Sequence, residues 1–261
     1  MSTITQPALF VSHGAPTLAL EDSPTARFLD RLGQTLPRPT AVVVVSAHWE
    51  SALPTMATHP TPGTIHDFGG FPRELYQVQY PAPGDPDLAR RVAKLLAPLD
   101  VNLDETWGLD HGTWSVLRHA YPAADIPVVQ LSIDQRAPAS FHFDLGRRLA
   151  PLRAEGVLIA ASGNLVHNLR AYDWGGEAHG PYDWAARFER RARALIEAGE
   201  FQPLVEYGNL GADAALAIPT PDHYLPLLYV LGARQPADPI AFPVEGVDGG
   251  SVSMLAVCVG A

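Results

Sequence analysis

Short apolar runs that do not alternate with polar residues recur along the chain and predict buried strands. Each is rich in Val, Ile, Leu or Ala and too short for a typical helix. The runs are Ala8–Ser12, Ala41–Ser46, Ile126–Ile133, Val157–Ala161 and Met254–Val259. A strand that is apolar at successive positions is buried on both faces, which is typical of a parallel or mixed sheet covered by helices.

Segments with helical spacing of apolar residues lie between these runs. They are predicted at Pro24–Leu32, Asp85–Leu96, Ala139–Leu152, Tyr182–Ala198 and His223–Leu231. The alternation of strand and helix predicts an α/β fold, with a central mixed, mostly parallel sheet flanked by helices. Because no internal repeat or linker interrupts it, we expect residues 1–261 to form a single domain.

Two further stretches, Pro54–Pro83 and Leu169–Pro181, are rich in Pro, Gly and aromatic residues and predict long ordered loops. Loops of this length in a compact domain are often functional. Four aromatic residues of these loops are candidates to line a pocket: Phe68, Phe71, Tyr76 and Tyr172. Packing into the core is an equally good explanation for each of them.

Composition and charge exclude several classes. Apolar residues make up 47% of the chain, enough for a sizeable core. A formal net charge of -10 disfavours a nucleic-acid partner. Cys258 is the only cysteine, so a disulfide within the chain and a cysteine-based zinc site are excluded. We expect no signal peptide, no membrane span and a cytoplasmic location.

Small polar residues and histidines follow the predicted strands. His13, His48 and His167 come after the first, second and fourth runs. Ligands of open α/β sheets collect just beyond the carboxyl ends of the strands. We therefore expect the active site at these ends, with His223 joining the three histidines from the turn after Asp222.

Histidines that converge in this way are suited to a divalent metal. Neutral imidazole is a common ligand of Zn and Fe, and three ligands on one face leave positions for substrate and oxygen. Glu50 and Asp222 are placed to orient the rings as outer acceptors. A surface or core role remains the better explanation for His59, His119, His142 and His179, while His66 is open between the two and Asp134 is expected to cap a helix.

Five motifs in order give the sequence a family resemblance. They are Ser12-His13-Gly14-Ala15-Pro16, Ser46-Ala47-His48-Trp49-Glu50, Asp110-His111-Gly112-Thr113-Trp114, Gly163-Asn164-Leu165-Val166-His167-Asn168 and Pro221-Asp222-His223-Tyr224. Together they resemble the class III extradiol ring-cleavage dioxygenases, in the branch of the bacterial and plant 4,5-DOPA dioxygenases. The resemblance extends from residue 8 to about residue 231.

The resemblance implies one non-haem divalent metal per subunit, held by His13, His48 and His223. Many class III relatives use two histidines and one glutamate, and His223 stands where those carry the carboxylate. Three neutral ligands suit Zn(II) as readily as Fe(II). Ring cleavage by oxygen needs a redox-active metal, so Fe(II) is expected for activity and Zn(II) is the alternative bound metal.

The resemblance also assigns catalytic roles. His167 matches the acid/base histidine of the family, close enough to the metal to be a fourth contact, and His111 matches a second active-site histidine. An ordinary imidazole pKa of about 6.5 suits removal and return of a proton at neutral pH. Tyr224, beside His223, is a candidate substrate-binding residue.

The implied reaction is the opening of a catechol-type ring of a DOPA-like substrate by O2, beside the two hydroxyls, to give a muconic semialdehyde type of product. The partners are then a small aromatic substrate and O2. Two alternatives use the same residues: a zinc-dependent hydrolase and a non-catalytic metal-binding relative. A requirement for Fe(II) and oxygen distinguishes the dioxygenase from both.

Overall fold

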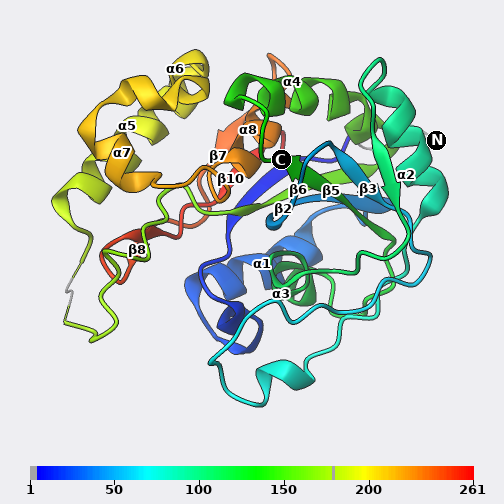
Figure 1. Cartoon of the computed structure of the whole chain (residues 1–261), viewed down its shortest axis with the longest axis horizontal. Coiled ribbons are helices and arrows are strands. Elements are labelled where there is room, and N and C mark those ends of the chain that lie inside the picture. Colours follow the sequence, from blue (N-terminus) through cyan, green and yellow to red (C-terminus); the bar gives the residue numbers. More distant parts are fainter. Residues whose placement is uncertain (1–4, 178–179) are drawn as a thin grey trace.

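The computed structural model describes residues 5–177 and 180–261, and an eight-stranded sheet forms its middle layer (Figure 1). The strand order is β4-β3-β5-β2-β6-β1-β10-β7. The strands are β1 (Ala8–Ser12), β2 (Ala41–Ser51), β3 (Thr55–Ala57), β4 (Asn102–Asp104), β5 (Val128–Asp134), β6 (Val157–Gly163), β7 (Ile240–Ala241) and β10 (Val257–Val259). A separate hairpin pairs β8 (Val247–Asp248) with β9 (Val252–Ser253).

The four central strands, β5, β2, β6 and β1, are parallel, whereas β10, β7 and the β3–β5 pair are antiparallel. The predicted mixed, mostly parallel sheet is therefore confirmed. Ser12 of β1 pairs with Gly163 of β6, and Ser46 of β2 pairs with Ser162. This register brings the residues that follow each strand to one edge of the sheet.

Helices cover both faces of the sheet. One face carries α1 (Pro24–Thr35) and α3 (His111–Ala120). The other carries α2 (Pro86–Leu95), α4 (Ala139–Leu149), α5 (Asp183–Ala198), α6 (Gln202–Val205), α7 (Ala212–Ala217) and α8 (Leu225–Gly232). Short 3-10 helices occur at Pro16–Leu20, Leu75–Gln77, Ala150–Glu155 and Tyr207–Leu210.

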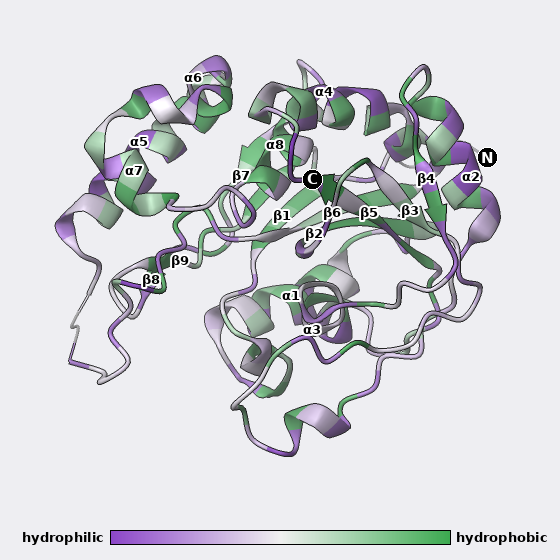
Figure 2. Cartoon of the chain, in the orientation of Figure 1, coloured by the Kyte–Doolittle hydropathy of each residue, from purple (hydrophilic) through white to green (hydrophobic). Residues whose placement is uncertain are grey.

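Both faces of the central strands are buried, as their apolar runs predict. Leu9 and Val11 of β1 pack toward α1 and α3, while Ala8 and Phe10 pack toward the opposite helical layer. The central strands are accordingly hydrophobic along their length, whereas α1, α2 and α5 mix hydrophobic and hydrophilic positions (Figure 2). Among the described residues, no helix is long and apolar enough to cross a membrane.

Two elements differ from the expectation in a way that matters for the site. Strand β2 continues to Ser51 rather than ending at Ser46, and its register with β5 shifts between Val45 and Glu50. The polar residues after Val45, where the sequence predicts the end of the strand, belong to this irregular stretch of β2. Helix α3 was not expected, because its residues from His111 onward are buried nearly all round and lack an amphipathic pattern.

Other element ends shift by a few residues for local reasons. Helix α4 gives way to a 3-10 turn before Pro151, and α8 begins at Leu225, so that His223 lies in the preceding turn. The predicted last strand, Met254–Val259, is shorter in the structure, where β10 covers only Val257–Val259. The expected helix cap at Asp134 is wrong: its carboxylate accepts the backbone N–H of Arg136 in a turn, and α4 begins five residues later.

Candidate metal centre

Three of the predicted histidines meet at the carboxyl edge of the sheet. His13 directly follows β1, His48 lies in the irregular end of β2, and His223 lies in the turn before α8. One nitrogen from each ring lies within 4.8 Å of the others. The Nε2 atoms of His13 and His48 are 2.9 Å apart.

The second nitrogen of each ring faces a polar partner. His13 Nδ1 lies 2.9 Å from Ser162 Oγ, and His223 Nδ1 is hydrogen-bonded to Asp222. His48 Nδ1 lies 3.6 Å from Asp67 Oδ2. With Nδ1 engaged in this way, each ring directs Nε2 toward the common centre, which is how outer-shell acceptors orient metal-binding imidazoles. The donor set therefore fits a divalent metal.

The outer carboxylates are held as anions. Burial alone would raise the pKa of Asp222, but hydrogen bonding to His223 and the charge of that ring outweigh burial and lower it. Burial opposes a low pKa at Asp67 as well, and hydrogen bonds from His111 lower it. Asp222 thus has the predicted orienting role. The other acceptor is Asp67 rather than Glu50, whose side chain is exposed.

Backbone packing sets the position of His223. Its carbonyl accepts the N–H of Asn164 at 2.9 Å, just beyond β6. A Cβ at Gly163 would lie 2.2 Å from that same carbonyl oxygen, so only glycine allows the turn to approach the strand this closely. The end of β6 therefore fixes the third histidine against the first two.

A buried network positions His111 at the start of α3. Asp110 is fully buried and accepts hydrogen bonds from Ser46 Oγ at 2.7 Å, Gln130 Nε2 at 2.7 Å and the N–H of Thr113 at 3.1 Å. The last of these caps the helix. His111 in turn donates its backbone N–H to Asp67 and has Nδ1 2.9 Å from the same carboxylate.

His167 lies against the ligand cluster from the other side. Its ring stacks on His223 with centroids 3.6 Å apart and an interplanar angle of 8°. Its backbone N–H donates to Ala217, and the residue bridges to Val252 of β9. The ring of His111 lies against that of His48, with centroids 3.8 Å apart and an interplanar angle of 46°. The structure therefore brings all five predicted site histidines together.

Burial controls the protonation of these rings. It lowers the pKa of His13 and His48 well below the usual value, and neighbouring imidazoles lower it further. Burial, together with the nearby His223, lowers the pKa of His167 to about 3. The expected ordinary pKa of His167 is thus wrong. The three rings are neutral at pH 7, the form that can bind a metal or accept a proton.

A pocket of about 250 Å³ opens above the histidines, with a lining that is mostly apolar. It is lined by His13, Gly14, Ala15, Pro16, His48, Phe68, Phe71, His111, His167, Leu169, Tyr172, Trp174, His223, Asp248 and Val252. Three of the aromatic candidates, Phe68, Phe71 and Tyr172, are among them. A hydrophobic pocket above a few convergent polar groups is the usual form of a small-molecule site.

Tyr224 does not line this pocket, so its prediction as a substrate-binding residue is wrong. Its side chain is 1% exposed, its hydroxyl donates to the carbonyl of Leu204 at 2.8 Å, and its ring packs against Tyr207. Although it adjoins His223 in sequence, it points into the helical layer. Proximity along the chain misled here because neighbouring residues of a turn project in different directions.

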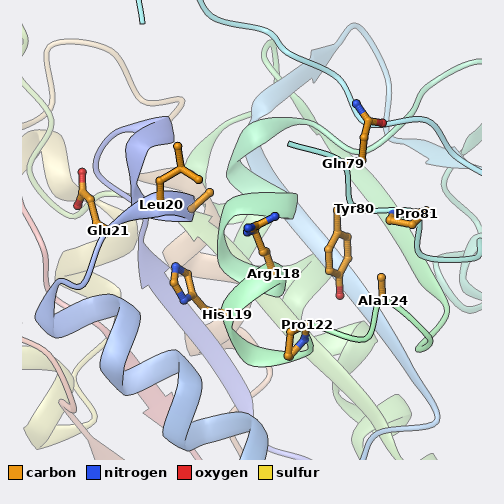
Figure 3. A pocket seen from close by; sticks show the side chains of 10 residues that line it. Leu20, Glu21, Gln79, Tyr80, Pro81, Arg118, His119, Pro122 and Ala124 are labelled. Carbon is orange, nitrogen blue, oxygen red and sulfur yellow. The ribbon is translucent and has the colours of Figure 1, made fainter. Parts of the chain in front are cut away.

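The remaining histidines have structural contacts where the structure describes them. His119 contacts Asp30 and the carbonyl of Leu18, His142 contacts Tyr229, and His59 accepts the N–H of Thr61. His66 is bound to the carbonyl of Val78 and packs among aromatic rings. His179 lies outside the described residues. A second cavity, of about 490 Å³, includes His119 but none of the clustered histidines (Figure 3).

The structure adds residues that the sequence did not single out. Asp67, Ser162 and Asp110 hold the histidines, while Trp174 and Asp248 line the pocket. Asp110 and Asp67 each adjoin a histidine in sequence, which is a weak signal. Ser162 and Asp248 carry none, because only the tertiary structure brings them to the site.

Comparison with known proteins agrees with this site. Residues 7–244 match the family model described as the catalytic LigB subunit of aromatic ring-opening dioxygenase. A 4,5-DOPA dioxygenase extradiol of Escherichia coli K12 is 54% identical over 264 residues, covering 100% of this chain and 97% of that protein. The enzyme of the same name from Beta vulgaris is 38% identical, covering 94% and 92% of the two chains.

A solved structure shares the fold. The crystal structure of an uncharacterized protein from Escherichia coli K12 has a TM-score of 0.85 and 48% identity, and the match covers 98% of this chain and 100% of that one. A sheet with a histidine cluster at its carboxyl edge and an apolar pocket above defines a metal-dependent enzyme acting on a small molecule. The chain belongs to the LigB family of aromatic ring-opening dioxygenases, in its extradiol, DOPA-dioxygenase branch.

Proposed function

We propose that this enzyme opens the catechol ring of a DOPA-like substrate with O2, using Fe(II) held by His13, His48 and His223. The observation that carries the proposal is the convergence of these three rings, each with its other nitrogen facing a polar partner. Three neutral ligands leave room for further ligands. Family membership supports a dioxygenase over a hydrolase built on the same residues.

When bound, Fe(II) would supply the redox chemistry that joins the catechol to O2. The protein residues bind the substrate and move its protons. The apolar wall of the pocket, including Phe68 and Phe71, excludes water from the ring. His167 lies beside His223 and lines the pocket, so its ring is placed to accept a phenolic proton and return it later in the reaction.

His111 has a complementary task. Asp67 accepts a hydrogen bond from His111 Nδ1 and so fixes the orientation of the ring. The opposite nitrogen is then left to hydrogen-bond the substrate in the pocket that His111 lines. Both atoms of O2 enter the product as the ring opens beside the two hydroxyls, which gives a muconic semialdehyde.

Substitution of the histidines separates metal binding from proton transfer. We expect His13→Ala and His48→Ala to lose bound metal and activity together, because each removes a ligand. His167→Ala should retain most of the metal and lose about 10²- to 10⁴-fold in kcat, the usual contribution of a general acid–base. Metal analysis of the purified variants and oxygen-uptake kinetics measure the two effects.

His59, which is half-buried and does not line the histidine pocket, provides the matched control, and His59→Ala should change neither quantity. Full metal content in His13→Ala would contradict the ligand assignment. Full turnover in His167→Ala would contradict its role as the base while leaving the ligand set intact.

A further inference from the structure

The β8–β9 hairpin carries a carboxylate into the pocket. Asp248 lies opposite Val252 in this hairpin, and Val252 pairs with His167 through an isolated antiparallel bridge. Residues that face each other across antiparallel strands project on the same side, with Cα atoms about 5 Å apart. His167, Val252 and Asp248 therefore form a row of roughly 10 Å, and all three line the pocket.

Neighbouring groups hold the Asp248 carboxylate in place although the residue is exposed. The hydroxyl of Tyr172 donates to Oδ2 at 2.8 Å, and the N–H of Gly249 donates to Oδ1 at 2.9 Å. Gly249 has φ +49°, and a Cβ there would lie 2.2 Å from the Tyr172 ring, so the ring lies directly against the hairpin backbone. Trp174, 76% exposed, has its ring 4.6 Å from that of Tyr172.

The lining of the pocket carries an acidic side chain but no lysine or arginine among the described residues. Asp248 is that side chain, and it is the only acidic one among the described lining residues. A cationic group at this end of the pocket would meet a carboxylate and two aromatic side chains, both of which attract cations. An anionic group there would find no basic side chain to pair with.

We propose that Asp248, oriented by Tyr172, selects substrates by a primary ammonium group at the end of the side chain of the catechol. The proposal rests on the function proposed above, which places the hydroxyls at His13, His48 and His223. The side chain then extends along the row from His167 toward Asp248. Because the lining offers no cation for a carboxylate, the preferred class is catechols with an aminoethyl side chain, whether or not a carboxylate is also present.

Three catechols with side chains of similar length but different charge test the proposal. They are 2-(3,4-dihydroxyphenyl)ethylamine, neutral 4-ethylcatechol and anionic 3-(3,4-dihydroxyphenyl)propionate. Oxygen uptake gives kcat/KM for each with the Fe(II)-loaded enzyme. We expect Asp248→Asn to lower kcat/KM for the amine about tenfold, through KM, since one charge-assisted hydrogen bond is lost at an exposed site. The value for 4-ethylcatechol should not change, and that for the propionate should rise.

Glu21→Gln is the matched control. Glu21 is an exposed carboxylate that shares a neighbouring cavity with Asp248 but does not line the histidine pocket. The substitution makes the same change in net charge as Asp248→Asn. Because Glu21 does not line the histidine pocket, it should leave kcat/KM for all three catechols unaltered. An equal effect of Glu21→Gln and Asp248→Asn on the amine would overturn the proposal, because long-range charge would then explain the preference.

Binding without turnover provides a second readout. Quenching of tryptophan fluorescence in Zn(II)-loaded protein under argon gives Kd for the amine and for 4-ethylcatechol. The ratio of these constants should shift about tenfold toward the neutral compound in Asp248→Asn. An unchanged ratio, with 4-ethylcatechol still opened by the Fe(II) enzyme, rejects the role of Asp248 and leaves the proposed function standing. Absence of turnover with all three catechols rejects both.

Discussion

Two kinds of buried histidine occur in this protein, and their neighbours determine what each can do. His13, His48 and His223 direct one nitrogen toward a shared centre beside a pocket. His142 is completely buried in the core, where its Nδ1 lies 3.0 Å from the hydroxyl of Tyr229. The first group is suited to bind a ligand, whereas His142 can only affect stability.

The buried His142 makes stability depend on pH. Burial lowers its pKa to about 4 in the folded protein. The unfolded chain, with an ordinary imidazole pKa, binds a proton more readily, so the stability is full above about pH 6.5 and falls as the pH drops toward 4. The complete loss is on the order of 3 kcal/mol.

Comparison with His142→Phe isolates this contribution. Urea unfolding of the metal-free proteins at pH 7.5 and pH 5 should show a larger acid-induced loss in the wild type, by about 2 kcal/mol. The other histidines titrate in both proteins and cancel in the difference. An identical pH dependence in the two proteins would show that His142 is not held neutral by the fold.

At the residue level, the sequence motifs predicted the five clustered histidines, but of their partners only Asp222 was predicted. A histidine after a strand is visible in the sequence. Ser162 lies 149 positions from His13, and Asp67 lies 44 positions from His111, so nothing local indicates either pair. Tyr224 shows the reverse error, since it adjoins a site residue but faces the core.

The end of β6 and the turn before α8 act together at the level of elements. Gly163→Ala would place a methyl group against the carbonyl of His223 and push the turn away from the strand. We expect a loss of stability of about 2 kcal/mol, typical of overpacking, and weaker metal binding because His223 moves. Thermal unfolding and metal titration measure these effects.

Gly208→Ala is a suitable control, since a Cβ there meets nothing within 4 Å and the backbone has no positive φ. It should leave both stability and metal binding close to those of the wild type. Unchanged metal affinity in Gly163→Ala would show that the site does not depend on this close approach.

Elements were predictable where one pattern dominates. The central strands are apolar on both faces and the amphipathic α1 and α2 follow helical spacing, so each appears in the sequence. Helix α3 is buried nearly all round, and the end of β2 mixes polar residues with strand pairing. In both elements the demands of the site replace the regular pattern, which is why the sequence did not reveal them.

On the scale of the whole molecule, the parallel core explains why distant histidines meet. Strands β1, β2 and β6 are adjacent in the sheet, and their carboxyl ends share one edge. Helix α3 and the turn before α8 bring His111 and His223 to the same edge from opposite helical layers. The topology could be predicted in outline, whereas the hairpin β8–β9 that completes the pocket could not, because its two-residue strands are too short to give a pattern.

Oxygen uptake by metal-free protein, reconstituted anaerobically with either Fe(II) or Zn(II), tests the central claim most directly. The substrates are DOPA and 4-ethylcatechol. With Fe(II), we predict that one O2 is consumed for each ring opened, together with a new yellow chromophore, and that Zn(II) supports neither. Oxygen-independent turnover with Zn(II), or no uptake of oxygen with Fe(II) and any catechol, would contradict the assignment of this site to iron-dependent ring opening.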